Sequence, residues 1–326
     1  MLLLALPPEV ICCVVEHLDV CTFCRLVAAS ASVRDWLCAA PLRLWSDLRC
    51  SGQAARVVDA PGLLALLRHA GARLCALDLH GCTKLTAATI DGILHSTQMQ
   101  TVVRSLGLGG ARFVAPQDNS DPALTFSGLP HCHALTRLDV AGCRAVGSAA
   151  VASIAALLRS PGCRLRFLAL DGCASSLAPR KKALPGVPSA LPLAVLGGDQ
   201  HHEPGSITTI PTTVPAVGLL ELGLSGYSQL QDSSVARSIP RGSALRVLRL
   251  GGSDVLQLRH DGAAEAALWQ CGGQQLIALD LSLCSQLDAA MLRQLLDRLP
   301  HLQRLNLLGC KTLTDEVALQ VNNLIR

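Results

Sequence analysis

The sequence predicts an α/β solenoid, with a curved parallel sheet inside and helices outside, preceded by a small all-helical module. Three observations predict this architecture. The pattern L-x-x-L-x-L, with Val replacing Leu at two positions, recurs eight times between residues 74 and 307. Segments with helical periodicity separate the copies, and the first 50 residues lack the pattern but carry apolar residues at helical spacing. Stacked units of this kind bury their strand and helix faces against neighbouring units.

The copies follow one another at a nearly constant interval. Their starts lie 26 to 32 residues apart, except for one interval of 54 residues. A degenerate copy at Leu193 would divide that interval into 28 and 26 residues, so we count eight clear repeats and one doubtful repeat. The clear copies begin at Leu74, Val103, Leu135, Leu165, Leu219, Leu245, Leu276 and Leu302.

Each copy predicts a short strand, a turn and a helix. Apolar residues at positions 1, 4 and 6 form the strand, and the residues between them point to the opposite face because side chains alternate along a strand. Segments such as 86–96, 148–160 and 288–300 then return the chain to the next strand as helices. Ser, Thr or Asp near their starts can cap the exposed N–H groups.

The ninth position of the repeat is usually cysteine. A cysteine at a strand-to-helix turn is a small buried residue whose weak S–H donor can face backbone carbonyls. Reactive thiols need an activating neighbour, and the repeats supply none regularly. We therefore predict a structural role for the five cysteines at this position, which are Cys82, Cys143, Cys173, Cys284 and Cys310.

Residues 74–326 resemble the cysteine-containing class of leucine-rich repeats. The full signature of that class, L-x-x-L-x-L-x-G-C-x-x-L-T-D, is nearly intact in LQRLNLLGCKTLTD, from Leu302 to Asp315. The chain departs from it at positions 111, 227 and 253, where Ala, Tyr and Ser replace the cysteine. The resemblance implies a leucine-rich repeat solenoid over about three quarters of the chain.

A proline-rich segment at about residues 174–217 interrupts the repeats. It holds seven of the 17 prolines. Proline removes backbone donors and blocks helix interiors, so we expect most of this segment to be a loop. Two alternatives remain open for it, a partner-binding insert and a solvated insertion on a tolerant surface.

The N-terminal part of the chain divides into two pieces. Residues 1–50 are predicted to form short helices, and residues 51–73 a linking helix or a partial first repeat. About 45 residues of short helices bury too little surface to be stable alone, so this module needs a partner. A solenoid also needs its hydrophobic end covered, which makes a simple cap the alternative role.

The N-terminal module resembles an F-box, which docks onto the Skp-type adaptor of cullin-RING ubiquitin ligases. The matching residues are Leu6-Pro7, Glu9-Val10, Leu18-Asp19, Arg25-Leu26 and Leu44-Trp45, whereas Val33 stands where the family commonly has an aromatic residue. Trp45 would also brace the junction to the first repeat. The resemblance implies that the adaptor is bound by Leu6, Pro7, Glu9, Val10, Leu18, Leu26 and Trp45.

Length and composition set further limits on the chain. Its 326 residues exceed the size at which a single core stops growing, roughly 250 to 300 residues, so either two domains or an elongated fold is needed, and the repeats favour the second. A net charge of +4 and eight aromatic residues give no basic stripe and no stacking platform, which argues against nucleic acid as a partner.

The sequence also predicts the compartment. No apolar run reaches the roughly 18 to 20 residues of a membrane-spanning helix, so we expect no membrane partner. The opening MLLLAL has no basic residues and is broken by Pro7 and Pro8, so we expect no signal peptide. Fifteen cysteines, an odd number, favour a reducing compartment, the cytoplasm or the nucleus.

No catalytic pattern stands out, so we expect no enzyme. A phosphate-binding loop, a dinucleotide fingerprint and a nucleophile elbow are all missing from the sequence. Cys13, His17, Cys21 and Cys24 could be metal ligands, but they fall within two predicted helices rather than across a turn. We therefore predict no metal and no cofactor.

Recognition should come from the concave face of the sheet. Exposed strand residues line up between repeats roughly 4.8 Å apart, so they form rows of side chains. Charged residues flanking one large apolar residue suggest a protein partner surface with a central hot spot. We expect target binding by Asp78, Arg137, Asp139, Phe167, Glu221, Arg249, Asp280, Arg304 and Asn306.

Together these features predict a non-catalytic substrate-recognition subunit of an SCF-type ubiquitin ligase. The F-box would bind the Skp-type adaptor, and through it a cullin, while the repeats bind a target protein that the sequence does not identify. The alternative is a stand-alone leucine-rich repeat scaffold for protein–protein interaction, in which the N-terminal helices serve only as a cap.

Overall fold

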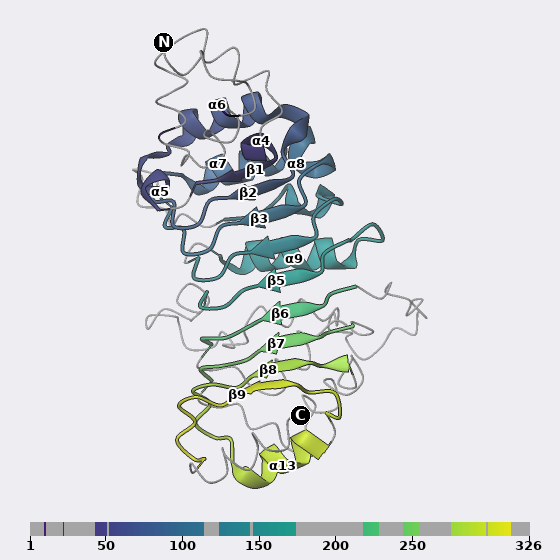
Figure 1. The fold of residues 1–326 in the computed structure, drawn as a ribbon. Coiled ribbons are helices and arrows are strands. Elements are labelled where there is room, and N and C mark those ends of the chain that lie inside the picture. The colour runs from purple at the N-terminus through teal and green to yellow at the C-terminus, as the bar shows by residue number, and fades with distance from the viewer. Residues whose placement is uncertain are drawn as a thin grey trace, which may run out of the picture.

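The repeats form one continuous parallel sheet. The computed structural model describes residues 10, 22, 43–50, 52–113, 124–143, 146–173, 218–227, 244–253, 275–297 and 299–313. In these residues nine strands pair in the order in which they follow along the chain (Figure 1). They are β1 Asp47–Arg49, β2 Ala76–Asp78, β3 Ser105–Gly107, β4 Arg137–Asp139, β5 Phe167–Ala169, β6 Glu221–Gly223, β7 Val247–Arg249, β8 Ala278–Asp280 and β9 Arg304–Asn306.

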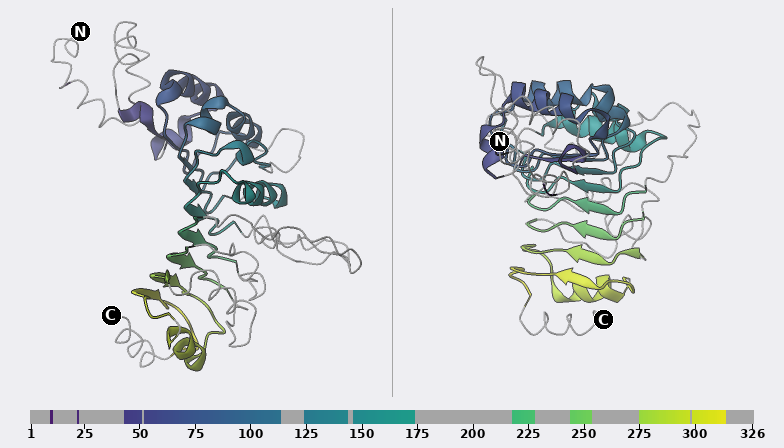
Figure 2. Two further views of the ribbon diagram at one scale, coloured as in Figure 1. Left: turned by 90° about the vertical axis from the view of Figure 1, so that its right-hand side faces the viewer. Right: turned by 45° about the horizontal axis from the view of Figure 1, so that its top comes forward.

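The helices of the repeats lie on one side of this sheet, as the left-hand view of Figure 2 shows. Side chains of the expected types cap three of them: Asp59 accepts a hydrogen bond from the backbone N–H of Gly62, and Thr86 and Ser96 cap the next two helices. The described helices are α4 Arg43–Ser46, α5 Gln53–Val57, α6 Ala60–Ala70, η2 Gly71–Arg73, α7 Ala87–Leu94, α8 Thr97–Thr101, η3 Leu129–His131, α9 Ser148–Arg159 and α13 Ala289–Asp297.

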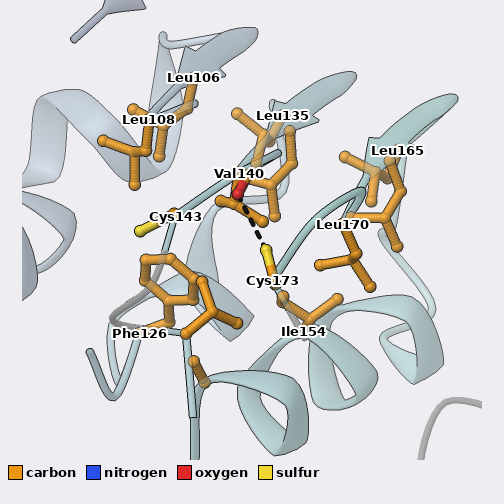
Figure 3. Close-up of a cluster of buried hydrophobic side chains, with 14 of the residues drawn as sticks. Leu106, Leu108, Phe126, Leu135, Val140, Cys143, Ile154, Leu165, Leu170 and Cys173 are labelled. Carbon is orange, nitrogen blue, oxygen red and sulfur yellow. Dashed lines mark hydrogen bonds between the residues drawn. The ribbon is translucent and has the colours of Figure 1, made fainter. Parts of the chain in front are cut away.

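The core lies between the sheet and the helices. Each strand places its central leucine opposite the central leucine of the next strand, as Leu106, Leu138 and Leu168 do. These three side chains are buried, and Phe126 and Ile154 pack near the same layer from the connecting segments (Figure 3). The structure is therefore an α/β leucine-rich repeat solenoid, which confirms the predicted fold class.

The cysteine position forms a ladder of weak hydrogen bonds. The thiol of Cys173 donates to the carbonyl of Val140 at 3.1 Å (Figure 3), and that of Cys310 donates to the carbonyl of Leu281 at 3.1 Å. In each case the acceptor is the sixth residue of the preceding repeat. Burial raises the pKa of the Cys173 thiol to about 12, so it stays protonated and unreactive. The structural role predicted for these cysteines is confirmed.

Tyr227 takes over the cysteine role in its own repeat. Its hydroxyl donates to the carbonyl of Leu170 at 2.9 Å, and the side chain is buried. Leu170 is again the sixth residue of the preceding repeat. A larger side chain therefore makes the same inter-repeat bond with a stronger donor, which explains why the repeat tolerates this departure from the signature.

The repeat array begins earlier than the sequence indicated. β1 falls inside residues 1–50, which were assigned to the helical module, and it pairs with β2 in parallel register. Trp45, Leu48 and Cys50 occupy positions 1, 4 and 6 of this first repeat, and the carbonyl of Cys50 accepts the thiol of Cys82 at 3.6 Å. Because Trp and Cys occupy two of the three apolar positions, a search for leucine does not find this copy of the motif.

The first repeat also explains the linking segment. Residues 53–73 form α5, α6 and η2, which lead from β1 to β2. Of the two alternatives for residues 51–73, the partial first repeat is therefore the better description, with its strand at Asp47–Arg49.

The doubtful ninth repeat at Leu193 does not enter the sheet between its neighbours. β5 pairs directly with β6, with Leu168 opposite Leu222, and this leaves no place for a strand between them. The proline-rich segment at 174–217 itself lies outside the described residues, so its predicted loop character and its two alternative roles stay predictions.

Candidate binding site on the concave face

The concave face, meaning the side of the sheet opposite the helices, carries two rows of side chains. Strand pairing places both rows in the register that the repeat spacing predicts, and β1 extends each by one residue. The first row is Asp47, Ala76, Ser105, Arg137, Phe167, Glu221, Val247, Ala278 and Arg304. The second row is Arg49, Asp78, Gly107, Asp139, Ala169, Gly223, Arg249, Asp280 and Asn306.

Phe167 lies at the centre of these rows between two arginines. The guanidinium of Arg137 stacks 3.4 Å from the ring centroid, and that of Arg249 lies 5.7 Å from it. Cation–π contacts of this kind orient both cations over the ring faces. The predicted hot spot is therefore assembled from three of the predicted residues, on β4, β5 and β7.

Arg249 is held in place by an acid that the sequence analysis missed. Its Nη2 lies 3.2 Å from Oδ2 of Asp171, whose Oδ1 accepts the backbone N–H of Ser225 at 2.7 Å. Asp171 follows the sixth repeat position, just beyond the strand, so it belongs to neither predicted row. A Cβ on Gly223 would lie 2.1 Å from that same carboxylate, so the ion pair requires a glycine in the strand it crosses.

A second bridge of the same design joins β2 to β4. Nδ1 of His80 lies 2.5 Å from Oδ1 of Asp78, and Nε2 lies 3.8 Å from Oδ2 of Asp139. A Cβ on Gly107 would approach both Asp78 and His80 to 2.9 Å. His80 follows its strand as Asp171 does, and the common signal is a glycine, Gly107 or Gly223, in the strand that the bridge crosses.

Electrostatics favour the ionised forms of the His80 and Asp78 pair. The hydrogen bond to Asp78 raises the pKa of His80 above its ordinary value, although partial burial works against this. Burial opposes the charge on Asp78, but hydrogen bonds from the side chain and backbone of His80 hold the pKa of that carboxyl below its ordinary value. A protonated His80 and an ionised Asp78 therefore stabilise each other.

These contacts run as one network from β2 to β7. Arg137 also pairs with Asp139 at 3.3 Å, which links the His80 bridge to the Phe167 stack. Because each charge already has a partner, the side chains are held before any target arrives, and less entropy is lost on binding. The network presents one half-buried aromatic ring framed by cations, a composition enriched at interface hot spots.

The C-terminal end of the face is hollowed. A depression of about 540 Å³ lies over β7, β8 and β9. Backbone amides of Ser282 and Leu308 donate to Asp280 and Asn306, which fixes both side chains, while Arg304 is exposed. The last predicted target residues therefore line one concavity, and Glu221 lies outside it, next to Phe167 in the first row.

The predicted adaptor residues fall mostly outside the described residues. Leu6, Pro7, Glu9, Leu18 and Leu26 are among those, and Val10 is helical with 44% of its surface exposed.

Trp45 is only 1% exposed and lies in the core of the first repeat, 6.0 Å from the ring of His69 and from the guanidinium of Arg73. It braces the junction as the F-box resemblance implied. It is too buried to touch an adaptor, so its place among the adaptor-binding residues is corrected.

Two other kinds of site are absent from the described parts of the chain. No helix among them is both long and apolar enough to cross a membrane. They contain no group of three or more His, Cys, Asp or Glu side chains able to hold a metal ion. Cys13, His17, Cys21 and Cys24 lie outside this part of the chain.

Comparisons with known proteins give a likeness in structure only. No protein-family model matches the sequence, and no curated protein does. A chain from the crystal structure of the Rad7 and Elc1 complex in yeast matches with a TM-score of 0.44 and 14% identity, over 81% of this chain and 64% of that one.

An internalin (inlF) from Listeria monocytogenes matches with a TM-score of 0.43 and 14% identity, over 80% of this chain and 58% of that one. The chain thus spans less than two thirds of the length of either protein. The assignment of the leucine-rich repeat fold rests on the sheet order and register themselves.

Proposed function

We propose that this protein is a non-catalytic substrate-recognition subunit of an SCF-type ubiquitin ligase. In this proposal the N-terminal helices dock onto a Skp-type adaptor, and through it a cullin, while the concave face binds a target protein. The protein acts in a reducing compartment, the cytoplasm or the nucleus, and needs no cofactor. It contributes to catalysis by raising the effective concentration of the target near the ubiquitin-charged enzyme.

The observation that carries the recognition half of the proposal is the Phe167 stack. An aromatic ring held between Arg137 and Arg249 is costly to maintain on a surface that serves only solubility, because the ring stays half-exposed to water. It sits at the middle of the sheet, flanked by charged side chains that can steer a complementary partner. A protein surface of opposite charge, with an apolar pocket for the ring, fits this arrangement.

The adaptor half of the proposal is supported by the F-box resemblance and by Val10. A pure cap turns its apolar residues toward the first repeat, whereas Val10 leaves 44% of its surface exposed. The first repeat already has Trp45 and Leu48 buried in its core, so the array does not depend on Val10 for cover.

Adaptor binding is tested by calorimetry with purified Skp-type adaptor and the full chain. A Leu6→Ala, Pro7→Ala double variant is expected to lose at least about 2 kcal/mol of binding free energy, as truncated anchor residues do. Leu308→Ala is the matched control, because Leu308 is an exposed apolar residue at the other end of the array and 78% accessible. If the folded wild-type chain binds no adaptor, the stand-alone scaffold becomes the better description.

Target binding is tested by comparing proteins captured by the full chain and by Phe167→Ala. Ser105→Ala is the control, because Ser105 lies in the same row and outside the stack. Proteins that depend on Phe167, and that accumulate when the chain is depleted from cells, would be targets for degradation. Captured proteins whose levels do not change would indicate a scaffold without a ubiquitin link.

A further inference from the structure

A second hollow lies at the edge of the sheet where the chain enters the strands. Its volume is about 680 Å³, and it spans the entries to β2, β3, β4, β5 and β6. We call it the basic edge pocket. It is lined by Cys75, Thr101, Val102, Arg104, Ala134, Thr136, Cys163, Arg164, Arg166 and Gly218.

The lining of the basic edge pocket has one sign of charge. It contains Arg104, Arg164 and Arg166, all exposed, and no carboxylate. Among the residues that the structure describes, no acid forms an ion pair with any of the three. Arg137 and Arg249 of the concave face differ in this respect, since they pair with Asp139 and Asp171. Three positive charges in one concavity, unpaired by any acid in the described parts of the chain, create a potential that attracts an anion.

The fold creates this cluster from residues that are far apart in sequence. Backbone N–H groups of Thr136 and Arg166 donate to the carbonyls of Arg104 and Thr136, at 2.7 and 2.8 Å, so the three residues follow one another along the edge. Arg104 and Arg166 are thus two strand spacings apart, about 10 Å. The absence of a basic stripe, inferred from the sequence, is corrected locally, because the repeat stacks arginines that lie 62 positions apart.

The lining favours phosphate over a carboxylate because, although a guanidinium fork fits both, three arginines match the larger charge of a phosphoryl group. The planar guanidinium fork matches the paired oxygens of a phosphoryl group, and three forks can share its charge of about −1.5 to −2 at pH 7. The hydroxyl of Thr136 donates to the Arg104 carbonyl at 2.9 Å, which anchors the middle of the site. The volume exceeds that of one phosphate, so the hollow also has room for the chain that carries it.

The basic edge pocket lies next to the Phe167 stack along two of the strands. Thr136 and Arg166 of the pocket directly precede Arg137 and Phe167 of the stack in the chain. A protein segment that crosses the concave face and leaves it at the strand entries therefore passes over both. The lining contains no aromatic side chain on which a base could stack, which favours a phosphorylated protein over a nucleic acid.

We propose that the basic edge pocket binds a phosphorylated side chain on a protein partner. Phosphate recognition there is independent of the adaptor. Only the identification of that partner as a target for ubiquitination rests on the function proposed above.

The test uses the full chain and two fluorescent libraries of nine-residue peptides, with random flanks around a central phosphoserine or serine. Fluorescence anisotropy measures their affinities. We expect the phosphoserine library to bind about tenfold more tightly or better, inorganic phosphate to compete, and added salt to weaken binding. Equal affinity for the two libraries would overturn the proposal.

The variants assign binding to the pocket. Arg104→Gln, Arg166→Gln should lose about tenfold or more of its affinity for the phosphoserine library, since two charge-assisted contacts are removed. The control, Arg68→Gln, Arg112→Gln, removes two exposed arginines elsewhere and makes the same change in net charge. A double variant that binds as tightly as wild type, or a control that loses as much, would refute the assignment.

Two further measurements keep the outcomes separate. The first is the affinity for a single-stranded RNA. If the RNA binds the wild type more tightly than the phosphoserine library does, and if the Arg104→Gln, Arg166→Gln variant no longer binds it, the ligand of the pocket is a nucleic acid and not a phosphorylated protein. Adaptor affinity, measured on the same variants, should stay unchanged. If the chain binds adaptor but shows no preference for phosphopeptides, only the phosphate site is refuted. If it prefers phosphopeptides but binds no adaptor, only the ligase proposal is refuted.

Discussion

The two faces of the same strands follow opposite rules. Toward the helices, the central residue is leucine in all nine strands, and Leu48, Leu77 and Leu168 are examples that are almost completely buried. Toward the concave face, the matching positions vary from glycine to arginine and phenylalanine. On the inward side every repeat needs a side chain of the same shape, because the repeats stack on one another. On the outward side each repeat can offer a different contact to a partner.

The difference teaches where information about function lies in a repeat protein. The inward residues are interchangeable between repeats, so they identify the fold and nothing more. The outward residues carry meaning only in combination, as in the pair of Asp171 and Arg249, which lie 78 positions apart and meet over Gly223. Substitutions on the two faces should therefore separate stability from binding.

The largest expected effect is that of Cys284→Arg on the inward side. The thiol is 1% exposed and donates to Leu250, so a guanidinium there would be buried without a partner. We expect a chain that is insoluble or melts without cooperativity in circular dichroism. Leu283→Arg, at the adjacent and 61% exposed residue, should stay soluble and fold. A cooperative melt of Cys284→Arg would contradict the ladder.

Leu138 and Arg137 sharpen the comparison, because they are neighbours on β4 that face opposite ways. Leu138→Ala should lower the free energy of unfolding by about 2 to 5 kcal/mol, the range for a leucine removed from a tight core. Arg137→Ala should cost less than about 1 kcal/mol, since the Arg137 side chain is 47% exposed and water screens its charge. Urea denaturation measures both, and equal costs would break the comparison.

Tyr227→Phe tests the inter-repeat bond without changing the shape of the core. Removing the hydroxyl takes away the 2.9 Å bond to the Leu170 carbonyl and leaves that oxygen with the longer 3.3 Å bond from the backbone N–H of Cys173. We expect the free energy of unfolding to fall by about 0.5 to 1.5 kcal/mol, which is the usual net worth of one hydrogen bond. If the free energy of unfolding does not change in the same urea titration, the hydrogen bond of Tyr227 adds nothing to stability and the side chain contributes by packing alone.

Gly223→Ala tests the outward side alone. Its added Cβ would displace the Asp171 and Arg249 side chains, whose flexible ends can move, so the stability cost should stay below about 1 kcal/mol. Arg249 would leave the Phe167 ring, and affinity for a target that uses the stack should drop. Ala169→Gly in the same row is the control. Unchanged affinity with intact stability would show that the bridge is not needed for binding.

The smallest expected effect concerns the His80 and Asp78 pair. The pKa of His80, measured by NMR titration, should exceed about 6.5, and Asp78→Asn should lower it. A raised His80 pKa adds stability below about pH 6.5, which is lost as pH rises through the folded value. A lowered Asp78 pKa adds stability above about pH 3.9, which is lost as pH falls. An unchanged His80 pKa in Asp78→Asn would argue against the pair.

Much of the fold could be predicted from the sequence because the repeat motif occurs in eight clear copies. Register and both rows followed from spacing alone, since parallel strands one repeat apart must align. The first repeat was not predicted, because Trp45 and Cys50 replace leucine at positions where burial matters more than residue type. A search that accepts Trp and Cys as well as Leu at positions 1, 4 and 6 would have found it.

The candidate sites were only partly predictable. Phe167 and its arginines were named from the rows, but His80 and Asp171 lie just past the strands, where side chains can swing back over the sheet. The basic edge pocket needed the fold itself. Arg104 and Arg166 become neighbours only once the entries of successive strands are stacked.

The cysteine ladder has a consequence for how unfolding can be observed. Burial raises the pKa of Cys82 and Cys284 to about 11, so a folded repeat presents almost no thiolate to an alkylating reagent at neutral pH. A repeat that opens would expose its thiol and become labelled. Mass spectrometry of the labelled sites would then identify the repeat that opens first. The cysteines therefore allow local unfolding to be followed repeat by repeat along the array.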